Sequence, residues 1–225
     1  MAKYGARYSC WAPFSASAED NEPTKLPVYD TTVLPLGELN KANESLTFAE
    51  GTLPGDDKIA LYERQFKDGK LDVESVYIAN ETAGKLFGTS VDEAKGLAFG
   101  DDDKPPYGGY GCITHHLSKS ERFWQAIFYP KVKALPPTED SITTRGDNLN
   151  FSTDKLPFHV ELPACRKYKV IKDFPSEAEA MQYIKDLFAG KAKVPGLAAP
   201  AMSAQVDGAK TAETSAVSAD PAGKK

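Results

Sequence analysis

One stretch decides the fold class of this chain: Phe123-Trp124-Gln125-Ala126-Ile127-Phe128-Tyr129-Pro130-Lys131-Val132. It is dense in aromatic and β-branched residues and has the length of a long β-strand. Residues 113–117 lie before it as a second strand candidate, and the polar residues 118–121 between the two have the composition of a turn. The three segments together predict a β-hairpin.

Similar patterns recur on both sides of this hairpin. Residues 158–162 alternate apolar and polar side chains, which is the period of a half-buried strand. A second hairpin is predicted with its turn at residues 67–70, between residues 61–66 and the apolar Leu71 and Val73. Further short strands are expected at residues 33–36, 46–48, 148–151 and 168–171.

Two helices interrupt the strands. The stronger signal begins at Ser176, where a glutamate follows three residues later in the spacing of a capping box, and Gly190 suits the position after the helix end. A weaker signal covers residues 80–87, with Asn80 as the N-cap and Gly88 as the stop. The chain is therefore predicted to be mainly β, with a flanking helix.

The two ends differ from the middle in composition. Residues 1–30 hold three prolines and a polar run, so we expect an extended N-terminal arm. Residues 190–225 are rich in Ala, Pro and Lys and hold no aromatic side chain, so they cannot bury enough apolar area to offset the entropy cost of ordering. This predicts a flexible tail, and residues 31–189 are left as the β domain.

Charge and cysteine usage exclude several classes of protein. The 225 residues carry a net charge of −5, and five Lys against three acids in residues 190–225 leave −7 on the rest. Such a balance argues against a protein that grips nucleic acid phosphates. Three distant cysteines, Cys10, Cys112 and Cys165, fit a reducing compartment better than a disulfide scaffold. We expect neither a membrane helix nor a secretory signal.

The residues that could carry chemistry do not form a catalytic pattern. His115 and His116 are adjacent, so in a strand they point to opposite faces and cannot chelate one ion together. Residues 101–103 are three aspartates without the spacing of a calcium loop, and we expect a solvated turn there. The glycine-rich residues 108–111 precede no helix signal, so they predict a sharp bend or a close backbone approach. We predict a structural or binding protein, not an enzyme, without cofactor or metal.

A series of short motifs occurs in one order along the chain. They are Lys3-Tyr4-Gly5-Ala6-Arg7-Tyr8, Trp11-Ala12-Pro13-Phe14, Leu36-Gly37-Glu38-Leu39-Asn40-Lys41, residues 61–71, Pro106-Tyr107-Gly108-Gly109-Tyr110-Gly111, residues 127–134 and Thr144-Arg145-Gly146-Asp147-Asn148-Leu149-Asn150-Phe151. Their order and spacing, over about residues 3–188, resemble the major tail proteins of long-tailed siphophages, particularly those of Gram-positive hosts.

The resemblance implies a fold and a function. The fold would be two antiparallel sheets packed as a sandwich or partial barrel, flanked by a helix. Six copies would form a ring, and stacked rings would form the tail tube that conducts DNA from the capsid to the host cell without binding it specifically. The expected partners are further copies of the chain and other tail proteins: the tape measure, the tail terminator and the distal tail protein. The expected location is the virion, after synthesis in the host cytoplasm, with no membrane partner.

The resemblance also implies two sets of interface residues. Residues 41–57 match the loop that ties one ring to the next, and the candidates in it are Asn43, Phe48, Leu53, Pro54 and Asp56. The N-terminal arm supplies the second set, which is Tyr4, Arg7, Tyr8, Trp11 and Phe14. An acidic lumen that repels DNA would also account for the negative charge of residues 1–189.

Two other functions remain open on the sequence alone. One is a virion receptor- or carbohydrate-binding β-sandwich, for which Tyr107, Tyr110 and Trp124 would line a groove. The other is a hydrolase that uses carboxylates from separate loops, such as Asp101 and Glu139.

Overall fold

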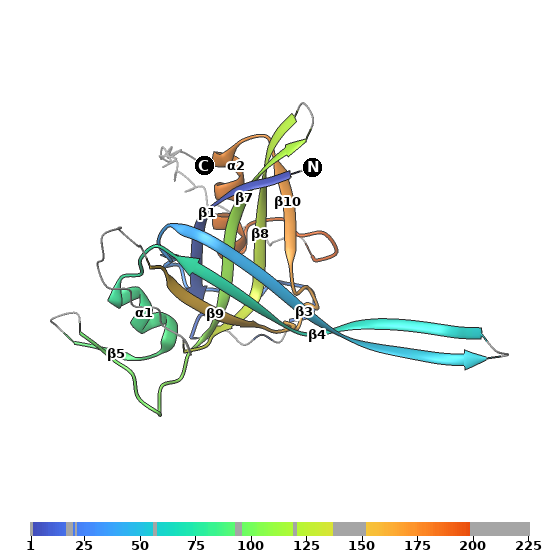
Figure 1. Ribbon diagram of the computed structural model, residues 1–225, viewed down its shortest axis with the longest axis horizontal. Coiled ribbons are helices and arrows are strands. Elements are labelled where there is room, and N and C mark those ends of the chain that lie inside the picture. The colour runs from blue at the N-terminus through green and yellow to red at the C-terminus, as the bar shows by residue number, and fades with distance from the viewer. Residues whose placement is uncertain are drawn as a thin grey trace, which may run out of the picture.

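The computed structural model describes residues 2–16, 20, 22–55, 58–92, 96–118, 121–136 and 152–198 (Figure 1). These residues are mainly β, as predicted, with one main helix beside the sheet. The strands are β1 (Ala2–Pro13), β2 (Leu34–Pro35), β3 (Leu39–Gly55), β4 (Lys58–Ser75), β5 (Ser90–Val91), β6 (Leu97–Ala98), β7 (Tyr107–Ser118), β8 (Glu121–Ala134), β9 (Asp154–Val160) and β10 (Val170–Phe174). The helices are α1 (Asn80–Phe87) and α2 (Glu177–Phe188).

The main sheet is antiparallel, and it divides at β8. Its strand order is β2-β1-β7-β8-β9-β4-β3, and β10 pairs with β8 beside this path. β10 pairs with residues 124–128 of β8, whereas β9 pairs with residues 132–134 of the same strand. Figure 1 shows β9, β4 and β3 running across β1, β7 and β8. The sheet therefore curls over itself into a partial barrel.

Two buried clusters lie on the two sides of β7 and β8. The inner cluster, inside the curl, includes Trp11, Tyr110 and Phe158, each fully buried. The outer cluster lies under α2 and includes Phe128 and Ile184. Because both faces of β8 are covered, five consecutive residues of this strand are buried, which explains why its sequence is apolar without alternation.

Helix α2 packs closely on the sheet because small residues face it. A Cβ atom added at Gly111 would lie 2.7 Å from Cγ2 of Ile184, and one at Gly109 would lie 2.7 Å from Cε1 of Tyr29. Such separations are shorter than carbon atoms tolerate, so a larger residue at either position would force its neighbour to move. The close backbone approach predicted for residues 108–111 is confirmed.

The helix boundaries were predicted well for α2 and less well for α1. Ser176 is the N-cap of α2 and its Oγ accepts a hydrogen bond from the backbone N–H of Glu179 at 3.3 Å, while Gly190 after the helix has a φ of +66°. Gly88 ends α1 in the left-handed conformation, as predicted. The N-cap of α1 is Ala79 and not Asn80, which is the first helical residue.

The prediction of an N-terminal arm outside the core is wrong for residues 2–13. They form β1, which lies between β2 and β7 in the sheet. Trp11 faces the inner cluster, whereas Cys10 and Ala12 face α2. The aromatic side chain thus finds its burial within its own chain, and Pro13 only ends the strand.

The predicted turn at residues 67–70 and the predicted loop at residues 41–57 are also wrong. β4 runs without a break from Lys58 to Ser75, and β3 pairs with it along its length. Thr47 opposes Asp68 and Phe48 opposes Phe66, so Lys67 is the extra residue of a β-bulge. A turn-like composition has here produced a bulge inside one long hairpin.

The predicted tail boundary at residue 190 is too early. Val194 is buried in the outer cluster, and the Tyr183 hydroxyl donates a hydrogen bond to the Lys193 carbonyl at 3.1 Å. The backbone N–H of Ala198 pairs with the carbonyl of Thr24 at 2.9 Å. Residues 190–198 therefore belong to the packed body.

Several predictions fall outside the described residues. They concern the tail beyond residue 198, the strand at residues 148–151, and the candidates Asp56 and Glu139.

Candidate interaction surface

The β3–β4 hairpin extends beyond the rest of the molecule (Figure 1). Along β4, pairing with β9 stops at Gly69, so residues 58–68 have β3 as their only strand neighbour among the described residues. β3 is the last strand of the sheet, so no strand in the described part of the chain pairs with its second edge. The distal hairpin therefore presents unpaired backbone N–H and C=O groups on both edges.

The end of this hairpin carries large apolar side chains in solvent. We call residues 51–55 and 58–63 the hairpin tip. Its exposed apolar residues are Leu53, Ile59, Leu61 and Tyr62, with exposed fractions between 54% and 67%. Leu53 and Leu61 share one face of the hairpin, whereas Tyr62, the next residue of β4, lies on the opposite face. Large apolar side chains left in solvent mark candidate interaction sites on soluble proteins.

The two faces of the distal hairpin differ. On one face Leu53 lies opposite Leu61, and Glu63 follows on the same face. On the other face Phe48 lies opposite Phe66, and Arg64 covers the Phe48 ring with its guanidinium carbon 4.1 Å from the ring centroid. The face with Leu53 and Leu61 is therefore an exposed apolar surface next to a carboxylate. The other face is covered at Phe48 by Arg64 but leaves Tyr62 exposed nearer the end of the hairpin.

A set of contacts fixes the hairpin where it leaves the body. We call it the root clamp, and it joins the hairpin to the segment between β9 and β10. The Phe66 and Tyr168 rings stack with their centroids 4.3 Å apart and their planes 7° apart. Glu44 accepts a hydrogen bond from the Tyr129 hydroxyl at 2.8 Å and pairs with the ammonium of Lys169. The clamp holds the direction of the hairpin relative to the sheet.

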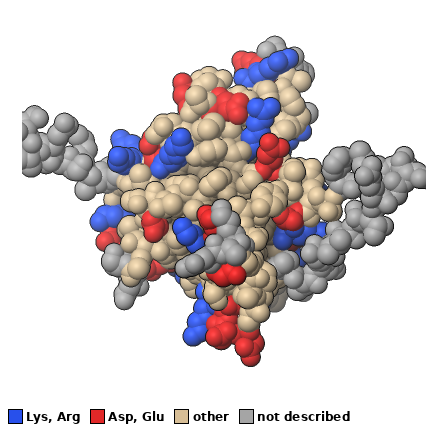
Figure 2. All heavy atoms as spheres, turned by 90° about the vertical axis from the view of Figure 1, so that its left-hand side faces the viewer, with Lys and Arg blue, Asp and Glu red and all other residues tan. Residues whose placement is uncertain are grey.

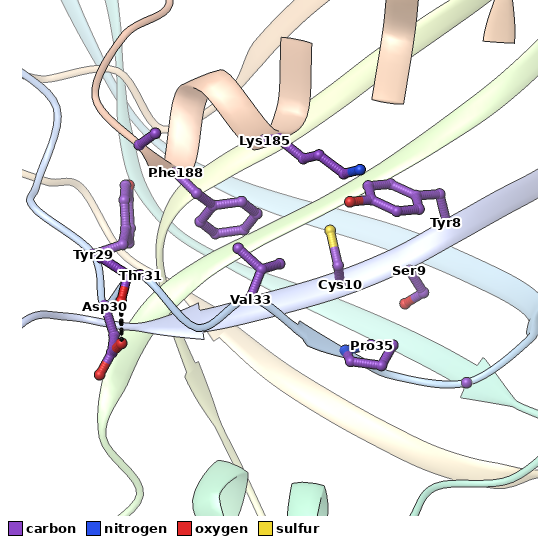
Figure 3. A pocket seen from close by; sticks show the side chains of 12 residues that line it. Tyr8, Ser9, Cys10, Tyr29, Asp30, Thr31, Val33, Pro35, Lys185 and Phe188 are labelled. Atoms are coloured by element: carbon purple, nitrogen blue, oxygen red, sulfur yellow. Dashed lines mark hydrogen bonds between the residues drawn. The ribbon is translucent and has the colours of Figure 1, made fainter. Parts of the chain in front are cut away.

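A second surface feature is a cleft of about 650 Å³ between β1, α2 and residues 29–37, which we call the β1–α2 cleft (Figure 3). Val33, Pro35 and Phe188 give it apolar walls. Figure 3 shows the side chains of Tyr8 and Lys185 reaching toward one another across it from β1 and α2. The cleft thus combines apolar walls with an ammonium group at its rim.

Tyr8 reaches this cleft because its backbone is unusual. Its φ is +55°, and the pairing of β1 with β7 shifts register between Arg7 and Cys10. Such a conformation costs a residue with a side chain about 1–3 kcal/mol. Burial raises the pKa of the Tyr8 hydroxyl to about 12, so it is protonated at neutral pH. Burial also raises the pKa of the Cys10 thiol, which leaves no reactive thiolate in the cleft.

The five candidates of the predicted arm do not lie on one surface. Trp11 is in the core, and Phe14 is partly buried against Tyr29. Tyr4 is exposed, and its ring lies 4.4 Å from that of His115. Arg7 forms an ion pair with Glu177, with 3.6 Å between Nη1 and Oε1, and Tyr8 lines the β1–α2 cleft.

The candidates of residues 41–57 are spread along β3. Asn43 lies in the half of the hairpin that β9 covers, because it pairs with Asp72. Phe48 lies under Arg64, and Leu53 and Pro54 are in the hairpin tip. Two residues named from the sequence, Leu53 and Pro54, thus lie in the hairpin tip. The exposed Ile59, Leu61 and Tyr62 of the tip were not named, although the apolar run at residues 59–62 was a signal for them.

The residues named for the two other functions are not gathered. Tyr110 is fully buried, so it cannot line an open groove. Tyr107 and Trp124 lie near opposite ends of the β7–β8 pair, opposite Lys133 and His115. Asp101 lies in an exposed turn. Within the described ranges, no group of three His, Cys, Asp or Glu side chains could hold a metal ion.

Charges of both signs are spread over the face that carries α1 (Figure 2). Acidic side chains gather at the lower end of this view, but Lys and Arg side chains lie among the others. This face is therefore not uniformly acidic. None of the helices in the described part is both long and apolar enough to cross a membrane.

No protein-family model matches the chain, and no curated protein is detectably similar to it in sequence.

Proposed function

We propose that this protein is a structural subunit of a siphophage tail, in which hexameric rings stack into the tube that conducts DNA. The proposal starts from the resemblance of residues 3–188 to major tail proteins. The partial barrel with α2 on its outer side agrees with the architecture that the resemblance implies. Other tail proteins would be its further partners, and the virion its location.

The observation that carries the proposal is the β3–β4 hairpin. A strand pair with two open edges and an apolar tip is unfavourable in an isolated molecule, because it can pair with any other exposed strand. A symmetric assembly satisfies such an element with a neighbouring copy. The contact between rings assigned to a loop at residues 41–57 is therefore reassigned to a hairpin.

The charge balance supports the same proposal. The chain has a net charge of −5, so it offers DNA little electrostatic attraction. A tube that passes DNA needs a wall to which the phosphates do not adhere.

Electron microscopy of the purified protein tests the proposal. Long tubes with a regular ring spacing are expected. Replacing residues 51–63 by a short Gly-Ser link should give a folded protein without tubes, because the root clamp stays in place while the tip is lost. The control is Tyr77→Ser with Phe99→Ser, which removes exposed apolar side chains outside the hairpin. Discrete particles from the unchanged protein would contradict the proposal.

A further inference from the structure

We infer that the β1–α2 cleft is the docking site for the hairpin tip of a second copy of this chain. The inference rests on the proposed function in that it takes assembly between copies as given. It adds a defined contact: the face bearing Leu53 and Leu61 enters the cleft, and Glu63 meets Lys185.

The first argument is the match of apolar surfaces. The tip offers Leu53 and Leu61 side by side, both more than half exposed. The cleft offers Val33, Pro35 and Phe188 around a volume of about 650 Å³. Pro35 is exposed and Val33 is half-buried, whereas Phe188 is buried and forms the floor of the cleft.

The second argument is charge complementarity. Glu63 lies on the same face as Leu61, and its carboxylate accepts a hydrogen bond from the neutral Gln65 amide at 3.0 Å. Lys185 projects at the cleft, and neither residue forms an ion pair among the described residues. The other charged group of the cleft, Asp30, accepts a hydrogen bond from the backbone N–H of Thr32 at 2.9 Å and keeps its negative charge. Figure 3 shows it at the far side of the cleft from Lys185, so the positive charge is at the Lys185 rim.

The third argument is geometric. The hairpin projects away from the side of the molecule that carries β1 and α2 (Figure 1), and the root clamp fixes its direction. The tip therefore cannot reach the cleft of its own chain. A contact between two different patches of identical chains is head-to-tail, and it can repeat from copy to copy in a ring or a filament.

The strained backbone of Tyr8 points to the same place. A residue that keeps a positive φ without being glycine is worth examining as a functional position. The strain turns the Tyr8 side chain into the cleft, where its hydroxyl stands beside the rim that receives the tip. The bulge thus shapes one wall of the docking site.

Photo-crosslinking tests the docking directly. The full chain is made with benzoylphenylalanine in place of Leu61, assembled, irradiated and analysed by mass spectrometry. We expect crosslinks between copies to peptides that contain Tyr8, Val33 or Phe188. Crosslinks to another part of a second copy, or none between copies, would overturn the docking site. If the unchanged protein forms no tubes, the proposed function fails instead, and crosslinks into the cleft would still support the docking.

A charge exchange gives an independent measurement. Glu63→Lys alone and Lys185→Glu alone should each raise the protein concentration needed for assembly about 2- to 5-fold, as expected for loss of a surface pair. The double variant should return to within about twofold of the unchanged protein. The matched control is Lys185→Glu with Glu121→Lys, which has the same net charge but leaves Glu63 in place, and it should not recover. Equal behaviour of the two double variants would overturn the contact, and thermal melts confirm that each variant is folded.

Discussion

The molecule contains two long antiparallel hairpins, β7–β8 and β3–β4, which share their local structure and differ in what covers them. In β7–β8, α2 covers one face and β9 and β4 cover the other, and Ile113 and Phe128 are fully buried. In β3–β4 the cover ends near Gly69, and Leu61 remains 57% exposed. Strand formation therefore depends on the partner strand alone, whereas burial depends on a third element. For the distal half of β3–β4, we propose that another copy supplies that element.

The largest expected effect is the loss of a core side chain. Phe128→Ala should lower the free energy of unfolding by about 3–5 kcal/mol, because it removes a fully buried ring between β8 and α2. The matched change in the other hairpin, Leu61→Ala, should stay within about 0.5 kcal/mol of the unchanged protein. Urea denaturation of the unassembled protein measures both. Similar losses in the two variants would remove the contrast between the hairpins.

High pH acts on the covered region through its buried acidic groups. Burial raises the pKa of the Cys112 thiol from its ordinary value of 9.0 to about 11, and it also raises the pKa of Tyr110 and Tyr129. The folded state holds these protons more tightly than the unfolded state does. The contribution of these groups to the free energy of unfolding is therefore fully present below about pH 9. It should fall by about 2–3 kcal/mol from the thiol alone as pH rises toward 11. Denaturation at a series of pH values measures it, and a flat profile above pH 9 would contradict the burial of these groups.

Two glycines offer a matched pair of smaller changes. Gly111→Ala should cost about 1–3 kcal/mol, because the added Cβ would lie 2.7 Å from Ile184 and force α2 away from β7. Gly51→Ala in the hairpin tip should be nearly neutral, since no atom lies within 4 Å of its added Cβ. The midpoint of thermal unfolding of each variant, compared with that of the unchanged protein, measures both effects. A neutral Gly111→Ala would mean that α2 packs less closely than described.

The smallest effect is expected at the root clamp. Tyr168→Ala removes the stacking on Phe66 and should cost about 0.5–1.5 kcal/mol. Its clearer consequence is dynamic: hydrogen exchange of backbone amides in residues 46–50 and 62–68 should become faster, while that of β7 and β8 stays unchanged. Tyr77→Ala, an exposed tyrosine outside the clamp, is the control. Exchange that does not respond to Tyr168→Ala would mean that the ring does not hold the hairpin.

The sequence predicts the elements whose signals are local. The alternation at residues 158–162 identified β9, in which Leu156, Phe158 and Val160 are buried, and the capping pattern identified α2. It cannot predict β1 as a core strand, because the burial of Trp11 depends on β7, which lies far along the chain.

The candidate surface was predicted in part for a related reason. Leu53, a candidate for the contact between rings, is exposed in the hairpin tip, but residues 67–70 have the composition of a turn, and only the pairing with β3 converts them into a bulge. The β1–α2 cleft gave no sequence signal, since it depends on the positive φ of Tyr8. A positive φ is usually indicated by a glycine in the sequence, and this position holds a tyrosine.

The pairing of β1 with β7 has a consequence for how the chain folds as it is made. Ser9 and Tyr110, whose hydroxyl groups lie 3.2 Å apart in the folded protein, are 101 positions apart in sequence. At a synthesis rate of about 5–20 residues per second, β1 leaves the ribosome roughly 5–20 s before its partner strand exists. During this interval the Trp11 side chain lacks the β7 residues that pack beside it in the folded protein, and only the short strand β2 is present to pair with β1. Residues 2–13 of the nascent chain therefore stay partly exposed until β7 has been made, which is a stage at which a chaperone could protect them.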